Sequence, residues 1–308
     1  MRAVQDEAPL SAGLKGLSIS TCAYQQALEY AQARAREAAP GQNGRPGKTP
    51  IRRPEVRRAL LSMKSRIDAM RALAAYVAMQ KDVAHWPEVA GNARELKQSH
   101  IALLMLVLDG WLTESAQAIT DDALEVCGGM GLNGDTGAAQ YCHDARLAKT
   151  FEGNSTAQAN DLVCHNTLGD QGATAFSLID TILGDIRPLT PQDHAAAGAV
   201  SELLIEGIVA LRNSVQWFLN CPQPKRRDLY PGAVPYLELW GLICGGWMHL
   251  LRLRAAQGNG ESHERLAATA LSASFFAQHV LVRAPMLATT IRLEADSVIA
   301  FPDTGWLE

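Results

Sequence analysis

Apolar residues recur at intervals of three and four positions along most of this chain, and this spacing restricts the fold more than any other feature of the sequence. One such stripe consists of Val56, Leu60, Met63, Ile67, Met70, Ala74 and Val77. Residues at these steps share one face of an α-helix, so the stripe predicts a long amphipathic helix. Short segments of alternating apolar and polar residues with hairpin turns between them do not occur, so we expect no β-strands.

The same spacing predicts helices in both halves of the chain. An earlier helix is indicated by Leu14, Leu17, Tyr24, Leu28 and Ala31, before a Pro- and Gly-rich loop at residues 39–50. Residues 101–108 are apolar almost all round, which suits a central helix enclosed by others. In the second half, residues 200–218 keep helical spacing, and two or three further helices follow to about residue 300.

These patterns predict an all-α protein. At 308 residues the chain is long enough for roughly two domains of about 150 residues each. The segment 166–172, which contains two glycines, interrupts the helical pattern. We therefore expect an antiparallel helical bundle over residues 1–168 and a second helical domain over residues 169–308.

The composition excludes several classes of protein. Lys and Arg total 28 against 32 Asp and Glu, a net charge of −4, so we do not expect a nucleic-acid partner. The cysteines are widely spaced and the N-terminus lacks an apolar signal region, which suits a reducing, cytoplasmic location. The apolar stretch 239–251 has 13 residues, fewer than the roughly 20 that span a bilayer, so we expect a buried helix there and no membrane span.

Sequence motifs for metal binding and nucleophilic chemistry are missing. The histidines are scattered, and the segment 262–266 lacks the second histidine of a zinc-binding helix, so no metal is expected. No G-x-S-x-G nucleophile elbow occurs, which leaves hydrolase chemistry without support. The basic run 51–58 is either a solvated helix start or a site for an anionic ligand.

Glu152 is the first candidate for a catalytic residue. It precedes Gly153 and a run of small polar residues. A carboxylate in the first turn of a helix is favoured by the free N–H groups and the helix dipole, and that structural role needs no chemistry. Alternatively, Glu152 is a base whose pKa is tuned by an apolar pocket, and Gly153 lets a ligand approach the backbone. The local sequence leaves both roles open.

The Gly-Gly-Met-Gly turn at residues 128–131 is the second candidate. Because glycine has no Cβ, such a turn permits close approach of a phosphate-bearing cofactor. The segment does not match G-x-G-x-x-G and no predicted strand precedes it, so a plain turn between two helices is the alternative.

The order of these segments resembles that of a known family. A helix ending in YAQARAR is followed by a loop, by RRPEVRRALLSMKSRIDAMRAL, by a buried helix and by ALEVCGGMGLNGDTGAAQYCHDARLAKTFEGNSTAQANDLV. Over residues 12–163 this order resembles the C-terminal helical domain of the acyl-CoA dehydrogenases. The remainder, including YLELWGLICGGWMHLLRLRAA, is similar to the extra C-terminal helical domain of a bacterial subgroup that includes the methylmercaptopropionyl-CoA dehydrogenases.

The resemblance implies an FAD-dependent enzyme of fatty acid metabolism that dehydrogenates an acyl-CoA thioester between its α and β carbons. Glu152 falls on the family's catalytic base, which removes the α-proton while a hydride passes to the flavin. The backbone N–H of Glu152 would bind the thioester oxygen, with Gly153 beside the substrate. The resemblance also implies electron-transferring flavoprotein or a similar acceptor as a partner, and a homo-oligomer.

Cofactor contacts are implied at several further positions. Arg34 matches the arginine at the end of the first helix that reaches the FAD pyrophosphate. Gly128 and Gly129 match a turn that packs on the dinucleotide of a neighbouring subunit, and Gln158 matches a polar position near the cofactor. Asn154 belongs to these contacts and replaces the threonine that the family usually has.

The chain also departs from the family pattern. Glu125 stands where glutamine is usual and places a negative charge near a pyrophosphate, while His143 and Arg36 replace arginine and glutamine. The chain begins where the family's third domain begins, so the N-terminal helical domain and the central β-domain are expected to be missing. We therefore expect the isolated chain to bind FAD weakly or not at all, and to be inactive unless a longer form or a separate chain supplies those domains. The alternative is a non-catalytic helical assembly module or a truncated remnant of such an enzyme.

Overall fold

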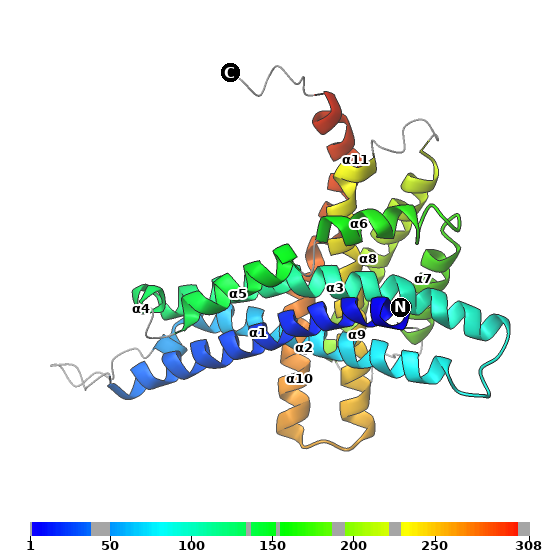
Figure 1. Ribbon diagram of the computed structural model, residues 1–308. Helices are drawn as coiled ribbons and strands as arrows, with labels where there is room; N and C mark the ends of the chain where they lie inside the picture. Colours follow the sequence, from blue (N-terminus) through cyan, green and yellow to red (C-terminus); the bar gives the residue numbers. More distant parts are fainter. Residues whose placement is uncertain are drawn as a thin grey trace.

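The computed structural model describes residues 2–37, 50–133, 137–151, 155–186, 195–221 and 229–300. Within these ranges the regular elements are α-helices and short 3-10 helices joined by turns, and no β-strand is present (Figure 1). The predicted all-α fold is therefore confirmed.

Three long helices and three shorter ones form the first half of the chain. They are α1 (Arg2–Glu37), α2 (Pro54–Ala84), α3 (Asn92–Cys127), α4 (Gly129–Leu132), α5 (Ala138–Phe151) and α6 (Ser155–Cys164), with the 3-10 helix η1 (Pro50–Arg52) ahead of α2. Pro54 opens α2, a position where its missing N–H would have no partner within the helix. The apolar stripe predicted between Val56 and Val77 lies within α2, and its members are buried or partly buried as expected.

The second half consists of helices that run in another direction. They are α7 (Ala173–Ile186), α8 (Ala195–Leu219), α9 (Ala233–Gly258), α10 (His263–His279), η4 (Leu281–Arg283) and α11 (Ala284–Ala300). In Figure 1, α9, α10 and α11 run steeply across the direction of α1, α2 and α3. The two sets of helices therefore meet at a crossing, which places residues from both halves of the chain side by side.

Helix α3 lies at the centre of the first half, as its apolar sequence predicts. It packs against α1, α2, α5, α6 and α9, and most of its side chains between residues 103 and 112 are buried. By length and composition, α3 is the one helix among the described residues that could cross a membrane, and 67% of its most apolar window is buried. The apolar surface that a bilayer would cover is thus largely covered by neighbouring helices. That the chain has no membrane span stays a prediction.

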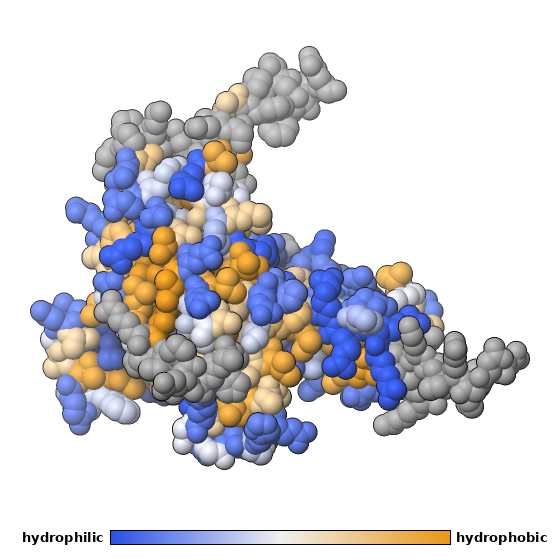
Figure 2. All heavy atoms as spheres, turned by 180° about the vertical axis from the view of Figure 1, so that it is seen from behind, coloured by the Kyte–Doolittle hydropathy of each residue, from blue (hydrophilic) through white to orange (hydrophobic). Residues whose placement is uncertain are grey.

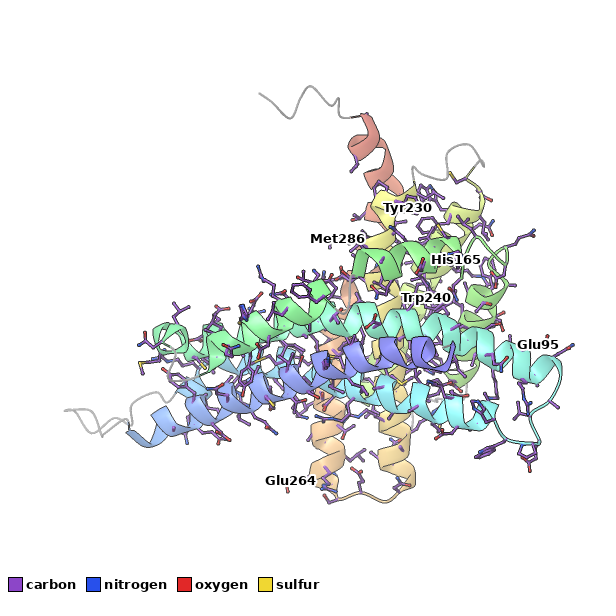
Figure 3. The ribbon with its side chains drawn as sticks, viewed as in Figure 1. Glu95, His165, Tyr230, Trp240, Glu264 and Met286 are labelled. Carbon is purple, nitrogen blue, oxygen red and sulfur yellow. The ribbon has the colours of Figure 1, made fainter. Side chains whose placement is uncertain are left out.

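Helix α9 is the most buried helix of the second half and joins that half to the first. Trp240 (labelled in Figure 3) and Trp247 are both 0% exposed, which confirms the expected buried helix at residues 239–251. Helix α9 contacts α2, α3 and α6 as well as α8, α10 and α11. A methyl group on Gly241 would overlap the indole ring of Trp111, so the missing side chain allows α9 to cross α3 closely.

The predicted domain boundary falls between α6 and α7. Residues 165–172 form a turn there, and α7 begins at Ala173. A single cluster of buried apolar residues nevertheless includes members from α1 to α11. The division into domains at residues 1–168 and 169–308 therefore stays a prediction.

Polar side chains between α2, α9 and α10 form a buried cluster centred on Asp68. Its carboxylate accepts hydrogen bonds from Lys64 Nζ at 2.9 Å and from Ser272 Oγ at 2.8 Å. Arg252 Nη1 lies 3.3 Å from the same oxygen. Burial by itself raises the pKa of Asp68, but Arg252 and Lys64 outweigh this effect and lower the pKa below its ordinary value. Asp68 is therefore ionised at neutral pH and links three helices.

Candidate active site

The predicted catalytic segment joins α5 to α6. Glu152, Gly153 and Asn154 lie outside the described residues, between Phe151 at the end of α5 and Ser155 at the start of α6. Phe151 is 79% exposed, whereas Ser155 is 3% exposed. Helix α5 therefore ends at the surface, whereas α6 begins in the core.

A single carboxylate on α3 holds both ends of this segment. Lys149 Nζ lies 2.8 Å from Glu114 Oε1 and donates to Glu114 Oε2 at 2.9 Å. Ser155 Oγ donates to Glu114 Oε1 at 2.5 Å. Hydrogen bonds to charged groups are shorter and stronger than those between neutral groups. Glu114 thus fixes the last turn of α5 and the first residue of α6 against the same point of the central helix.

Gln158, one turn further along α6, is also tied to α3. Its Nε2 donates to Asp109 Oδ2 at 2.5 Å, and Asp109 is 1% exposed. The other amide atom, Gln158 Oε1, is buried and has no hydrogen-bond partner among the residues that the structure describes. A buried acceptor of this kind is expected to find a donor, so it fits a polar group bound beside α6. The predicted proximity of Gln158 to a cofactor is compatible with this arrangement and stays a prediction.

The glycine turn lies at the other end of α5. Gly128 has φ +59° and ends α3, and its N–H donates to the carbonyl oxygens of Leu124 and Glu125 at 3.0 Å. Such a positive φ favours glycine. A Cβ on Gly128 or Gly129 would meet nothing within 4 Å, so the backbone here is open to a neighbouring molecule. The turn between two helices is confirmed, and its contact with a phosphate group stays a prediction.

A cavity of about 680 Å³ lies beside this turn. Its lining includes Tyr30, Arg53, Arg58, Asp122, Glu125, Gly128 and Gly129. The open glycine backbone and the two guanidinium groups suit the diphosphate of FAD, whereas the two carboxylates repel it. Burial raises the pKa of Asp122, and Glu125 faces the same cavity. The cavity therefore fits a diphosphate along the wall formed by the start of α2.

The basic run 51–58 contributes Arg53 and Arg58 to this cavity, and both of these residues are solvent-exposed. The choice between a solvated helix start and an anion site therefore stays open. Arg34 belongs to the last turns of α1, one helical turn beyond the lining residue Tyr30, and its side chain lies outside the described atoms. Tyr30 places the C-terminal part of α1 beside this cavity.

The two parts of the candidate site are well separated. Helix α5 has 14 residues, so about 21 Å lie between its ends. Figure 1 shows α4 at the outer end of α5 and α6 beyond its inner end. Within one chain, only an extended ligand could touch both the glycine turn and the segment 152–154. The separation is compatible with two subunits contributing different parts of one site.

Sequence reasoning missed the α3 residues that position this segment. Glu114 lies 35 residues before Lys149, and Asp109 lies 49 residues before Gln158. The available signal was the presence of two carboxylates in the apolar middle of this helix, residues 101–120, where ionised residues are rare unless they are paired. Their partners depend on how α5 and α6 pack against α3.

Two protein-family profiles together match most of the chain. Residues 9–164 match the profile described as "Acyl-CoA dehydrogenase, C-terminal domain", and residues 178–302 match "Acetyl-CoA dehydrogenase C-terminal like". These ranges are close to the two resemblances inferred from the sequence.

Curated relatives match along nearly the whole chain. The 3-methylmercaptopropionyl-CoA dehydrogenase of Ruegeria pomeroyi is 33% identical over 291 residues, which is 93% of this chain and 49% of that protein. The broad-specificity linear acyl-CoA dehydrogenase FadE5 of Mycobacterium tuberculosis is 27% identical over 308 residues, again 93% of this chain and 49% of that protein. The chain spans about half the length of these two relatives.

Solved structures share the fold. An acyl-CoA dehydrogenase complexed with FAD from Bacillus anthracis aligns with a TM-score of 0.63 and 12% identity, over 99% of this chain and 51% of that one. An acyl-CoA oxidase from Yarrowia lipolytica aligns with a TM-score of 0.60 and 15% identity, over 93% of this chain and 48% of that one. At these identities the likeness concerns the fold alone.

Proposed function

Because this chain belongs to the acyl-CoA dehydrogenase family, we propose that it is the C-terminal portion of an FAD-dependent enzyme that oxidises the α,β bond of an acyl-CoA thioester. The half of its relatives' length that this chain does not cover would supply the rest of the active site. The proposal extends the family assignment to an activity and a substrate class for this chain. It rests on the residues that surround the segment 152–154.

The observation that carries this proposal is that residues on both sides of the segment 152–154 bond to Glu114. Catalytic groups work only when the surrounding structure holds them in a narrow range of positions. Lys149 and Ser155, on either side of the segment, bond to the same carboxylate on the enclosed helix α3. Glu152 therefore lies between two fixed points, and only three residues separate α5 from α6.

In the proposed reaction the Glu152 carboxylate takes the proton from the α carbon of the acyl group. The backbone N–H of Glu152 donates to the thioester oxygen and stabilises the negative charge that develops there. Gly153, which has no side chain, leaves room for the acyl chain beside the backbone. FAD, when bound, supplies the acceptor for the hydride from the β carbon.

Gly128 and Gly129 would pack on the dinucleotide of a neighbouring subunit, Arg34 would reach the FAD pyrophosphate, and Asn154 and Gln158 would contact the cofactor. The length of α5, which separates the glycine turn from Gln158, supports an arrangement in which they serve different subunits. It requires a homo-oligomer, or a complex with a chain that supplies the missing domains.

Apolar surface supports the proposal of a larger assembly. Exposed large apolar side chains occur on several helices, at Met130, Leu132, Phe151, Ile205, Leu271 and Leu293. Figure 2 shows apolar atoms, in orange, gathered on the rear face of the molecule. Exposed apolar patches commonly mark contacts with other protein chains. The acceptor protein that would reoxidise the flavin, such as electron-transferring flavoprotein, is a further proposed partner.

We also propose a cytoplasmic location. All six cysteines are free, which is in keeping with a reducing compartment.

The test is the variant Glu152→Gln in the completed enzyme, made either from a longer form or by co-expression with a chain that supplies the other half. Glutamine keeps the size and polarity of the side chain but cannot accept the α-proton. We expect acyl-CoA binding to persist and single-turnover bleaching of the flavin to slow by about 10² to 10⁴. Glu95→Gln is the matched control, because Glu95 is exposed at the far end of α3 (Figure 3). A normal bleaching rate in Glu152→Gln with a lowered melting temperature would assign Glu152 to the structural role.

A non-catalytic helical assembly module is the second candidate function. The observation that favours it is Glu125, whose carboxylate faces the cavity where a diphosphate would lie. The two proposed functions predict different flavin contents for the complex that includes the missing domains. If the completed complex purifies without bound flavin and does not oxidise acyl-CoA, the assembly function is supported.

A further inference from the structure

A second cavity, of about 280 Å³, lies where the two halves of the molecule cross. Its walls come from α2 and α3 on one side, and from α9 and the corner between α10 and α11 on the other. A water molecule occupies about 30 Å³ in the liquid, so the cavity has room for about nine waters. Its size suits a small organic molecule.

The inner surface of this cavity is apolar. Trp111 and Leu237 are 4% and 1% exposed, and Leu242 and Val280 are 2% and 3% exposed. Ala118, on the α3 wall, leaves open space because its side chain is a single methyl group. An alkyl chain bound here would be transferred from water to an apolar surface, which is energetically favourable.

Four charged side chains also line the cavity, and three of them are in ion pairs. Glu238 Oε1 accepts from Arg283 Nη2 at 2.7 Å. Glu114 is paired with Lys149 at 2.8 Å. These side chains are between 34% and 40% exposed, so they form the rim next to solvent.

Arg66 is the fourth of these charged residues and differs from the others. It takes part in no hydrogen bond or ion pair with any residue that the structure describes. Burial lowers the pKa of Arg66 and Arg283 lowers it further, while Asp122 and Glu238 oppose these effects from a distance. Arg66 is partly buried, so its guanidinium has less water around it than a fully exposed arginine has. An anion in the cavity would supply the missing partner.

The charges around Arg66 favour an anion with a single negative charge. A carboxylate matches the fork of the guanidinium and accepts two parallel hydrogen bonds. A phosphate monoester carries nearly two charges at neutral pH and would be repelled by Glu114 and Glu238 on the rim. The apolar inner surface adds the requirement for an alkyl group.

We propose that this cavity binds a short-chain monocarboxylate of about six carbons, with its carboxylate on Arg66 and its alkyl chain against Trp111 and Leu237. The site needs neither FAD nor CoA and lies entirely within this chain. The proposal is therefore independent of the dehydrogenase activity and is tested on the chain alone.

The experiment measures the binding of radiolabelled hexanoate to the 308-residue chain by equilibrium dialysis. We expect saturable binding of one hexanoate per chain, competed by unlabelled hexanoate and much less by hexanol, hexylamine or hexyl phosphate. Arg66→Gln should weaken binding about tenfold to a hundredfold, because a charge-assisted hydrogen bond is lost. Arg57→Gln is the matched control, since Arg57 is exposed on the same helix, and it should bind as the unmodified chain does.

A second variant tests the cavity itself. Ala118→Phe keeps Arg66 but fills the space beside it, and it should reduce hexanoate binding to the level of Arg66→Gln. Circular dichroism of each variant shows whether it is folded. The proposal is overturned if hexanoate does not bind, if hexanol competes equally well, or if folded Arg66→Gln and Ala118→Phe both bind normally.

Discussion

Replacing Asp68 by alanine tests how strongly the buried polar cluster joins the two halves of the molecule. The Asp68 carboxylate is 7% exposed and lies among two hydrogen-bond donors, from α2 and α10, and an ion-pair partner from α9. Ser272, which is 1% exposed, donates to it at 2.8 Å. Lys64 is 40% exposed, so water can solvate it when the carboxylate is removed, whereas Arg252 Nη1 is buried and would lose the carboxylate that faces it. The loss of stability should therefore come mainly from the contacts with Ser272 and Arg252.

The magnitude follows from the exposure of each partner. A hydrogen bond to a charged group contributes about 1.5–3 kcal/mol, and this range applies to the buried Ser272 hydroxyl. The exposed i,i+4 pair with Lys64 contributes about 0.3–0.5 kcal/mol. The largely buried pair with Arg252 contributes about 1 kcal/mol. We therefore expect Asp68→Ala to lower the free energy of unfolding by about 3 kcal/mol.

The assay is urea unfolding of the isolated chain followed by circular dichroism. Asp82→Ala is the control, because Asp82 is exposed near the end of the same helix, and its effect should stay within about 0.5 kcal/mol. Ser272→Ala should cost about 1.5–3 kcal/mol alone and almost nothing when combined with Asp68→Ala, because the two residues share one interaction. A loss below about 1 kcal/mol in Asp68→Ala, or full additivity in the double variant, would refute the reasoning.

The same cluster predicts a pH dependence. Because the pKa of Asp68 is lowered in the folded state, the unfolded state takes up its proton first as the pH falls. The contribution of Asp68 is therefore fully present above its unfolded pKa, near 3.8, and is lost as the pH falls through the folded value. The difference in stability between the unmodified chain and Asp68→Ala should shrink in strong acid.

Two further predictions concern His249 and the glycine turn. Burial lowers the pKa of His249 to about 4, so the unfolded state binds its proton first as the pH falls, and the free energy of unfolding should decrease between about pH 6.5 and 4. His249→Phe should flatten this part of the stability profile, measured by urea unfolding at several pH values, and an unchanged profile would contradict the lowered pKa. At the glycine turn, Gly128→Ala should cost about 1–3 kcal/mol, because φ +59° with ψ −147° is a conformation that essentially only glycine adopts. Gly129→Ala, which opens the short helix α4, should cost far less. Equal melting temperatures for the two variants would show that the turn is not strained.

The spacing of apolar residues determined the secondary structure of this chain. Steps of three and four from Val56 to Val77 place a stripe on one helical face, and the structure has α2 there. The all-round apolar segment 101–108 required enclosure, and α3 is the central helix. Both inferences succeed because they depend only on residues close together in the sequence. The resemblance over residues 12–163 likewise drew on the order of local segments, and the profile match over 9–164 agrees with it.

The tertiary structure decided which distant residues meet. Asp68 and Ser272 are 204 residues apart, and no periodicity links them. Their contact depends on the steep crossing of α10 over α2, just as the contact of Gly241 with Trp111 depends on that of α9 over α3. Helical periodicity shows which face of a helix is buried. It contains no information on the angle at which two helices cross or on which helices are neighbours, because the packing of side chains from several helices sets both. For this reason the support of the segment 152–154 by Glu114, and the cavity around Arg66, could be found only in the folded chain.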